Sequence, residues 1–242
     1  MSLLIDADYF VYKSCASAED EIDWGDDTIT VVSSFHEVKR LITREIDTLK
    51  LKFKGEVEDL ILFFSSPNNF RKTIRSDYKG HRNRKKPCGY TRAINWLREE
   101  YQVETIDHLE ADDVLGIYST NEPGKHIICS PDKDMKQIPG LLYALNDEVQ
   151  EISKEEGDQW HLVQTLSGDQ TDGYAGVPGI GIKKAEALFN TDGWTWDTVV
   201  KAYTTKGLTE KDALENARLA RILRSEDFDK STNTPILWTP NK

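Results

Sequence analysis

The stretch "SLLIDAD", residues 2–8, is a short apolar run that ends in two carboxylates. "LILFF" (60–64) and "HIICS" (126–130) are similar runs, and "LLYAL" (141–145) is a weaker one. Continuous apolar runs of this length are typical of strands that are buried on both faces of a parallel sheet. The sequence therefore predicts three or four parallel strands.

Helical patterns lie between these runs. Ser34 followed by Glu37 is a capping-box signature, and apolar residues then keep helical spacing as far as Leu49. Residues 90–101 and the stretch that opens at Glu110 have the same spacing. Strands that alternate with helices predict an α/β fold with a doubly wound, mostly parallel sheet.

The pattern becomes mostly helical beyond about residue 155. We expect an α/β core over residues 1–155, which includes a basic region at 70–101, and a helical subdomain over 156–242. The tail "STNTPILWTPNK" (231–242) is expected to pack back on the body as an extended segment.

The composition is that of a globular protein. Of the 242 residues, 38% are hydrophobic, and no apolar stretch approaches the roughly 20 residues of a membrane span. The three cysteines are odd in number and far apart, so neither a disulfide framework nor a zinc site is indicated. We expect a soluble cytoplasmic monomer that has no contact with membranes.

Charge is distributed unevenly along the chain. The net charge is −11, but residues 70–86 hold eight Lys or Arg against one acid, so this segment is +7 and the rest is −18. Because the Debye length at physiological salt is about 8 Å, distant acids hardly weaken such a basic stripe. A polyanionic partner such as nucleic acid is therefore compatible with the acidic average.

Carboxylates gather at the ends of the expected elements, where sites lie in open α/β sheets. Each acid alone has an ordinary explanation, as a helix cap that gains about 0.3–1 kcal/mol from the dipole or as a turn former. These explanations do not account for the recurrence of acids at the ends of several expected elements. The acids are Asp6, Glu110, Asp112, Asp113, Asp132, Asp134, Asp169 and Asp172, with Asp8 nearby.

If these acids converge, they need cations. Two carboxylates 4 Å apart repel by about 4 kcal/mol at an effective dielectric constant near 20. Oxygen ligands without His or Cys at metal spacing favour Mg²⁺ or Mn²⁺ over zinc. Two such ions are a recurrent device for phosphodiester cleavage.

At these residues the sequence resembles the 5′ nuclease superfamily, which includes flap endonucleases, the 5′ nuclease domain of DNA polymerase I and bacteriophage 5′→3′ exonucleases. The resemblance spans roughly residues 2–190. The motifs that carry it are "LIDADYF", "FR" with "YKGHR", "LEADD", "SPDKD" and "GDQTDGYAGVPGIGIKKAEAL". It implies a PIN-like core with a helical arch, a helix-hairpin-helix-like subdomain, and hydrolysis of DNA from 5′ ends.

The resemblance also implies roles for individual residues. Asp6, Glu110, Asp112 and Asp113 would surround one metal ion, and Asp132, Asp134, Asp169 and Asp172 the second, while Asp8 matches less firmly. Lys79 and Arg82 would contact the scissile phosphate. The residues expected to bind DNA elsewhere are Arg71, Lys72, Arg84, Lys85, Lys86, Gly176, Gly179, Gly181, Lys183 and Lys184.

The glycines of "GVPGIG" (176–181) also have a physical role. Small residues let backbone N–H groups approach a phosphate, and the following helix adds its positive N-terminus. The spacing is not that of a dinucleotide-binding GxGxxG turn. The resemblance leaves open a potassium ion held by carbonyl oxygens of this hairpin.

The sequence departs from the family in two places. The stretch "FFSSPNNFR" (63–71) has Ser65 and Ser66 where family members commonly carry another acid. The segment from Gly80 to Glu110 is short for an arch through which a strand is threaded.

Two alternatives to a metal-dependent 5′→3′ exonuclease remain at this point. One is a DNA-junction binding module that has lost cleavage. The other is a haloacid-dehalogenase-type phosphatase, in which Asp6 would attack phosphorus and Asp8 would act as acid and base. That scheme gives the basic stripe and the glycine hairpin no role.

Overall fold

The computed structural model describes residues 1–82, 85–146 and 148–240. Its centre is a six-stranded sheet in which β8 is antiparallel to its neighbour and the other strands are parallel, so the expected α/β fold is confirmed. The strand order is β5 (Gln102–Glu104), β4 (Asp59–Phe63), β1 (Ser2–Asp6), β6 (His126–Cys129), β7 (Gly140–Tyr143) and β8 (Val149–Ile152).

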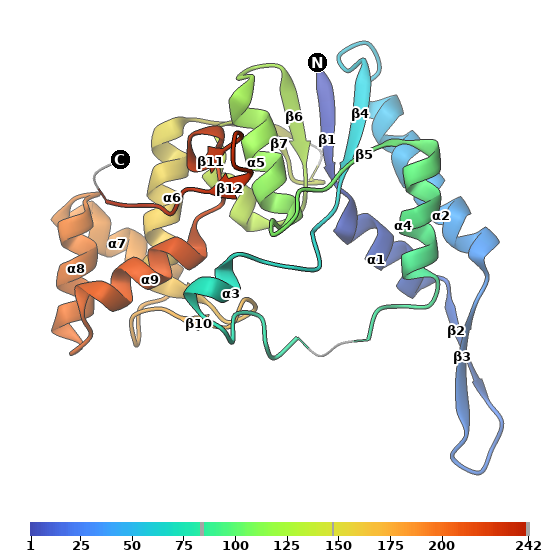
Figure 1. The fold of residues 1–242 in the computed structure, drawn as a ribbon, viewed down its shortest axis with the longest axis horizontal. Coiled ribbons are helices and arrows are strands. Elements are labelled where there is room, and N and C mark those ends of the chain that lie inside the picture. Colours follow the sequence, from blue (N-terminus) through green and yellow to red (C-terminus); the bar gives the residue numbers. More distant parts are fainter. Residues whose placement is uncertain (83–84, 147, 241–242) are drawn as a thin grey trace.

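The apolar runs form strands because both faces of the sheet are covered. One face packs on α1 (Ala7–Ser17), α2 (Phe35–Lys52) and α4 (Tyr90–Glu100), and the other on α5 (Ala111–Asn121), as Figure 1 shows.

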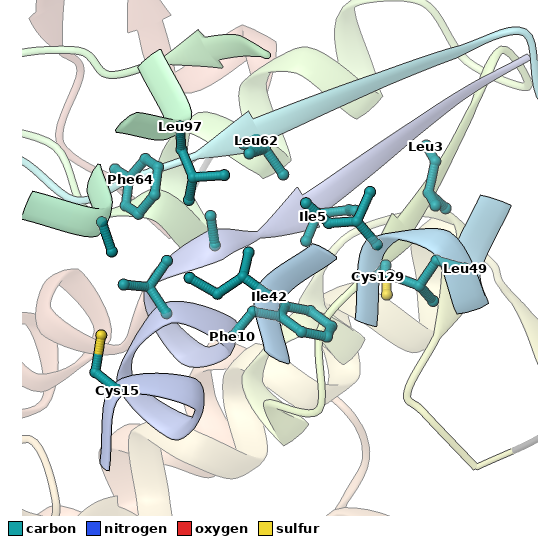
Figure 2. Close-up of a cluster of buried hydrophobic side chains, with 14 of the residues drawn as sticks. Leu3, Ile5, Phe10, Cys15, Ile42, Leu49, Leu62, Phe64, Leu97 and Cys129 are labelled. Atoms are coloured by element: carbon teal, nitrogen blue, oxygen red, sulfur yellow. The ribbon is translucent and has the colours of Figure 1, made fainter. Parts of the chain in front are cut away.

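Along β1 the side chains alternate between these two layers. Leu3 and Ile5 join the cluster drawn in Figure 2, where they lie with Phe10, whereas Leu4 packs against Val114 on the opposite face. This alternation explains why residues 3–5 are all apolar: both faces of the strand are covered.

The expected capping residue of α2 is confirmed. The Ser34 hydroxyl accepts a hydrogen bond from the Glu37 amide at 3.4 Å, which satisfies one of the free N–H groups at the start of this helix.

A two-stranded ribbon follows α1. Strands β2 (Glu19–Asp23) and β3 (Ile29–Ser33) pair antiparallel and project away from the body in Figure 1. Neither α1 nor this ribbon was expected from the sequence, because the ribbon has no buried face that would produce an apolar period. Trp24 at its turn is 67% exposed.

Four helices form the second part of the chain. They are α6 (Lys154–Ser167), α7 (Ile182–Asp192), α8 (Trp196–Thr205) and α9 (Glu210–Ala220). They share a cluster of buried apolar side chains. The division near residue 155 stays a prediction, although helices replace the strands of the main sheet there.

Short elements complete the chain. They are α3 (Arg71–Ile74), the 3-10 helices η1 (Lys133–Gln137) and η2 (Ser225–Asp227), and the strand pairs β9 (Gly168–Asp169) with β10 (Tyr174–Ala175) and β11 (Phe228–Asp229) with β12 (Thr234–Pro235).

The C-terminal tail packs back on the body, as expected. The Trp238 ring lies 5.0 Å from the His161 ring and 5.3 Å from that of Trp196, and the Ile236 amide donates to the Asp227 carbonyl at 2.8 Å.

The basic region 70–101 contains α3 and α4. Between them, the described residues of 75–89 include neither helix nor strand. Figure 1 shows this segment as an irregular connection that passes below the sheet. Among the described residues, every helix is too short or too polar to cross a membrane.

Candidate functional site

A pocket of about 550 Å³ lies beyond the carboxyl ends of β1, β4 and β6. Seven carboxylates of the described residues line it, together with four cationic side chains. The carboxylates are those of Asp6, Asp8, Glu110, Asp112, Asp132, Asp134 and Asp172, and the cations are those of Arg71, Lys79, Arg82 and Lys86. Acids from four separate parts of the sequence therefore meet in one place.

Asp6 is the last residue of β1 and is buried. Its carboxylate accepts a hydrogen bond from the Ser130 hydroxyl at 3.0 Å. Burial, together with the negative charge of Asp8, raises the pKa of Asp6 to about 7.

Asp8 lies in the first turn of α1, and both of its carboxylate oxygens have partners. One accepts from the Ser65 amide at 2.9 Å and the other from the Tyr90 hydroxyl at 2.7 Å. The Ser65 hydroxyl in turn accepts from the Ala111 amide at 3.0 Å. Ser65, which stands where the family commonly has an acid, thus links β4 to the start of α5.

Glu110 is the N-cap residue of α5 and the most strongly paired acid of the pocket. It accepts hydrogen bonds from Arg71 at 3.2 Å and from the Lys79 ammonium, and it shares the proton of the Tyr78 hydroxyl, 3.1 Å away, with Asp172. Burial alone would raise its pKa, but the charges of Lys79 and Arg71 lower the pKa of Glu110 to about 2.

Asp112, in the first turn of α5, has the opposite environment. Burial raises its pKa well above the usual range, and the charges of Asp6, Asp132 and Glu110 raise it further. Four acids around one space therefore destabilise one another's ionised forms.

Asp132 and Asp134 follow β6. Asp132 caps η1 by accepting from the Asp134 amide at 2.8 Å. The Asp134 carboxylate accepts from the Gln164 side-chain amide at 2.5 Å. Burial and the charge of Asp132 raise the pKa of Asp134 to about 7.

Asp169 and Asp172 come from the loop after α6. Asp169 does not line the pocket; it is buried and pairs with Lys133 at 2.9 Å. Burial opposes ionisation there, but the hydrogen bond from Lys133 lowers the pKa of Asp169. Asp172 faces the pocket and accepts from the Tyr78 hydroxyl at 2.8 Å and from Arg82 at 2.6 Å.

Lys79 and Arg82 also line the pocket. The Lys79 ammonium lies between Glu110 and Asp172, 3.4 Å from the latter. Burial would lower the pKa of Lys79, but these two acids raise it, so the side chain stays a cation. Arg82 is more exposed and also donates to the Thr171 carbonyl at 2.9 Å.

Two expectations are corrected by this arrangement. Asp113 is fully buried outside the pocket, and its two oxygens each accept from Arg71 at 2.7 Å, so the ion pair occupies the carboxylate expected to hold a metal. Arg71, expected to contact DNA, is 1% exposed and also donates to the Leu219 and Arg221 carbonyls, which leaves no free N–H for a phosphate. Both residues have a structural role.

The other basic residues expected at DNA stay accessible. Lys72, Lys85 and Lys86 are exposed, and the Lys86 ammonium lies 4.4 Å from the centre of the Tyr90 ring at the edge of the pocket. Arg84 lies outside the described residues.

The glycine hairpin divides into two parts. A Cβ on Gly176 would lie 2.2 Å from the Leu166 carbonyl oxygen, so this glycine is required for packing against α6 and not for reaching DNA. Gly179 and Gly181 face open space, and Gly181 caps α7. Lys183 is exposed, and Lys184 donates to the Gly179 carbonyl at 2.9 Å.

The acids line the pocket but do not converge into one compact cluster in the described part of the chain. Within residues 1–82, 85–146 and 148–240, no three His, Cys, Asp or Glu side chains form a compact metal-ligand group. Any ion bound there would complete its coordination with water or phosphate oxygens, which is usual for Mg²⁺.

Sequence reasoning gave three polar residues of the site no role. Tyr78 links Glu110 to Asp172, Tyr90 holds Asp8, and Gln164 holds Asp134. Tyr78 belongs to the motif "YKGHR", which could have indicated it. Tyr90 and Gln164 lie in helices, where such residues are ordinary, and only the folded arrangement brings them to the carboxylates.

Comparison with known proteins identifies the class of this chain as a nuclease. The chain belongs to the family described as 5′–3′ exonuclease, N-terminal resolvase-like domain, whose model matches residues 1–160.

Two viral relatives align over nearly the whole chain. It is 28% identical to the exodeoxyribonuclease of Enterobacteria phage T3, over 98% of this chain and 92% of that protein. It is 27% identical to the exonuclease of Escherichia phage T7, over 98% and 93%.

Among solved structures, the fold is similar to that of the bacteriophage T5 D15 flap endonuclease, solved with DNA and metal ions. The TM-score is 0.65 at 15% identity, and the match covers 90% of this chain and 88% of that one. The nuclease relatives favour neither an inactive binding module nor a phosphatase.

Proposed function

We propose that this nuclease is a Mg²⁺- or Mn²⁺-dependent 5′→3′ exonuclease that hydrolyses DNA from 5′ ends and also cuts 5′ flaps. The observation that carries the proposal is the pocket itself, in which seven carboxylates meet Lys79 and Arg82. The names of the phage relatives, and the DNA and metal ions solved with the T5 enzyme, support it.

The donor set fits divalent ions of the hard type. Asp6, Asp112 and Asp134 all have raised pKa values because they are buried and lie near other acids. A divalent cation would relieve this repulsion, and carboxylate oxygens without His or Cys are the ligands that Mg²⁺ and Mn²⁺ prefer.

Two ions would be held by the two sides of the pocket. Asp6, Glu110 and Asp112 are the candidates on the α5 side, and Asp132, Asp134 and Asp172 on the other, with Asp169 acting through its neighbours. When bound, such ions would supply an activated water and stabilise the leaving oxygen.

The chain's own cations would bind and orient the substrate. Lys79 and Arg82, which line the pocket, would hold the scissile phosphate next to the acids, while Lys72, Lys85 and Lys86 would bind neighbouring phosphates. The exposed start of α7, with Gly179, Gly181 and Lys183, would bind the backbone of the duplex outside the pocket. We extend the proposal to a potassium ion at this hairpin and to a monomer in solution.

In the phosphatase scheme Asp8 would have to shuttle a proton. Its two carboxylate oxygens already accept from Ser65 and Tyr90. This pairing gives that scheme no support.

The test is cleavage of duplexes labelled at the 5′ or the 3′ end, with Mg²⁺ or with EDTA. We expect the 5′ label to be released first and only with Mg²⁺. Early release of the 3′ label, or DNA that is shifted in a gel but never cut, would refute the proposal.

Asp112→Asn and Asp197→Asn form a matched pair, because each residue is the second of its helix and Asp197 is exposed, away from the pocket. Only Asp112→Asn should abolish cleavage. Blunt, nicked, single-stranded and 5′-flap substrates compared at one metal concentration would give the preferred end, and light scattering would give the oligomeric state.

A further inference from the structure

A buried segment passes behind the pocket. Residues 219–224, here called the strap, connect the last turn of α9 to η2, and each of the six side chains is buried. Leu219, Ala220 and Ile222 line the pocket. The strap therefore touches the site although it comes from a distant part of the sequence.

One side of the strap is hydrogen-bonded to the acids at the start of α5. Arg71 donates to the Leu219 carbonyl at 3.0 Å and to the Arg221 carbonyl at 2.5 Å, while it also binds Glu110. The Leu223 amide donates to Asp113 at 3.1 Å. Glu110 is thus fixed relative to the strap.

The other side is connected to Asp134 through two side-chain amides. Gln137 accepts from the Ile222 amide at 3.1 Å, and its own NH₂ group donates to the Ala220 carbonyl at 2.6 Å and to Gln164 at 2.6 Å. Gln164 then donates to one oxygen of Asp134 at 2.5 Å. Both glutamines are buried, at 0% and 2% exposure.

We infer that Gln164 and Gln137 are positioning residues that hold Asp134 at a fixed place relative to Glu110, with the strap as the common support. The inference rests on the proposed function, because it concerns how that pocket takes a divalent ion.

Each glutamine is oriented by its partners in this chain. The Gln164 carbonyl oxygen accepts from Gln137, so its NH₂ group is turned toward Asp134. Buried hydrogen-bond chains of this kind hold their members rigidly. The second Asp134 oxygen takes no hydrogen bond from any residue in the described part of the chain and is left for a ligand. Partners that orient metal ligands typically change metal affinity or activity by about 10- to 100-fold when removed.

The experiment uses the full chain with Gln164→Met, which keeps the length of the side chain and loses the donor. The control is Gln159→Met on the same helix, where Gln159 donates only to Glu155, at 3.3 Å, among the contacts of described residues. Mn²⁺ binding is measured without DNA by calorimetry, together with thermal unfolding, and the Mg²⁺ concentration for half-maximal single-turnover cleavage is measured separately.

We expect Gln164→Met to weaken Mn²⁺ binding and to raise the Mg²⁺ requirement by about 10- to 100-fold, with DNA binding in EDTA unchanged. Gln137→Met, which leaves Gln164 beside Asp134 but removes its support, should have an intermediate effect. This second variant also decides the matter if Gln164→Met does not fold.

Mn²⁺ affinity within about twofold of the control in the variants that fold would overturn the inference. Its failure is distinguishable from failure of the proposed function. In the first case the wild-type chain binds Mn²⁺ and cuts DNA while the variants match it, and in the second the wild-type chain itself does neither.

Discussion

Replacing Arg71 by Met should destabilise the whole chain far more than it affects contact with DNA. Arg71 donates five hydrogen bonds: two to Asp113, one to Glu110, and one each to the Leu219 and Arg221 carbonyls. Its removal leaves the Asp113 carboxylate buried without its cation. Breaking a buried pair in this way costs about 3–5 kcal/mol of unfolding free energy.

For a chain of this size each kcal/mol lowers the melting temperature by about 2–4 °C, so we expect a fall of roughly 6–20 °C. Thermal and urea unfolding at pH 7 measure it. The control is Lys72→Met, the exposed neighbour, which should melt like the wild type. The double variant Arg71→Met with Asp113→Leu should recover part of the loss, because no unpaired charge then remains buried.

The opposite pattern would refute the reasoning. If Arg71→Met melted within about 2 °C of the wild type and lost DNA affinity, Arg71 would be a DNA contact as first expected from the sequence.

Further outcomes follow from the pocket and the hairpin. In EDTA, the unfolding free energy should decline as the pH rises from about 4 to about 7, because the pKa values of Asp6 and Asp134 are raised from 3.8 to about 7 in the folded chain and the folded state binds the extra protons there. Mg²⁺ should consequently raise the melting temperature more at pH 8 than at pH 5, and an equal rise at both would contradict this. Lys79→Ala should slow single-turnover cleavage by about 10²- to 10³-fold with little change in DNA affinity. Lys206→Ala, at an exposed position outside the pocket, should leave the rate nearly unchanged, and equal rates for the two variants would remove the role of Lys79. Gly176→Ala should lower stability by about 1–3 kcal/mol, since its Cβ would meet the Leu166 carbonyl, and Gly181→Ala should change it by less than about 0.5 kcal/mol; unfolding curves that coincide would show that the backbone gives way easily.

The sequence predicts the centre of the fold because both faces of the sheet are buried. In a strand such as β1 the residues on both faces are apolar, so polar and apolar residues do not alternate along it. The strand is therefore visible in the sequence as a continuous apolar run. The ribbon β2–β3 could not be predicted in this way, because neither of its faces is covered and its sequence has no apolar pattern. In this ribbon Glu21 pairs with Val31 and Asp23 with Ile29. Helix α1 was missed because its sequence, "ADYFVYKSCAS", has only a weak apolar period.

The site was predictable as far as chain order and topology determine it. An acid at the end of a parallel strand, such as Asp6, or a few residues beyond it, such as Asp132, must lie near the carboxyl edge of the sheet. The side chain or backbone group that pairs with each acid could not be predicted. Asp113 and Asp112 are neighbours of the same type, yet one pairs with a guanidinium and the backbone of a segment 110 residues away and the other faces the pocket. No local pattern separates them.

The position of the strap has a consequence for synthesis on the ribosome. Glu110 and Asp134 are made early, but the carbonyls of Leu219 and Arg221 that fix Arg71 emerge only after α9. A nascent chain that stops before the strap contains all of the carboxylates that line the pocket. It lacks the segment that would hold Asp134 at a fixed position relative to Glu110. The enzyme should therefore mature late in translation, and chains truncated before residue 219 should be unable to degrade DNA.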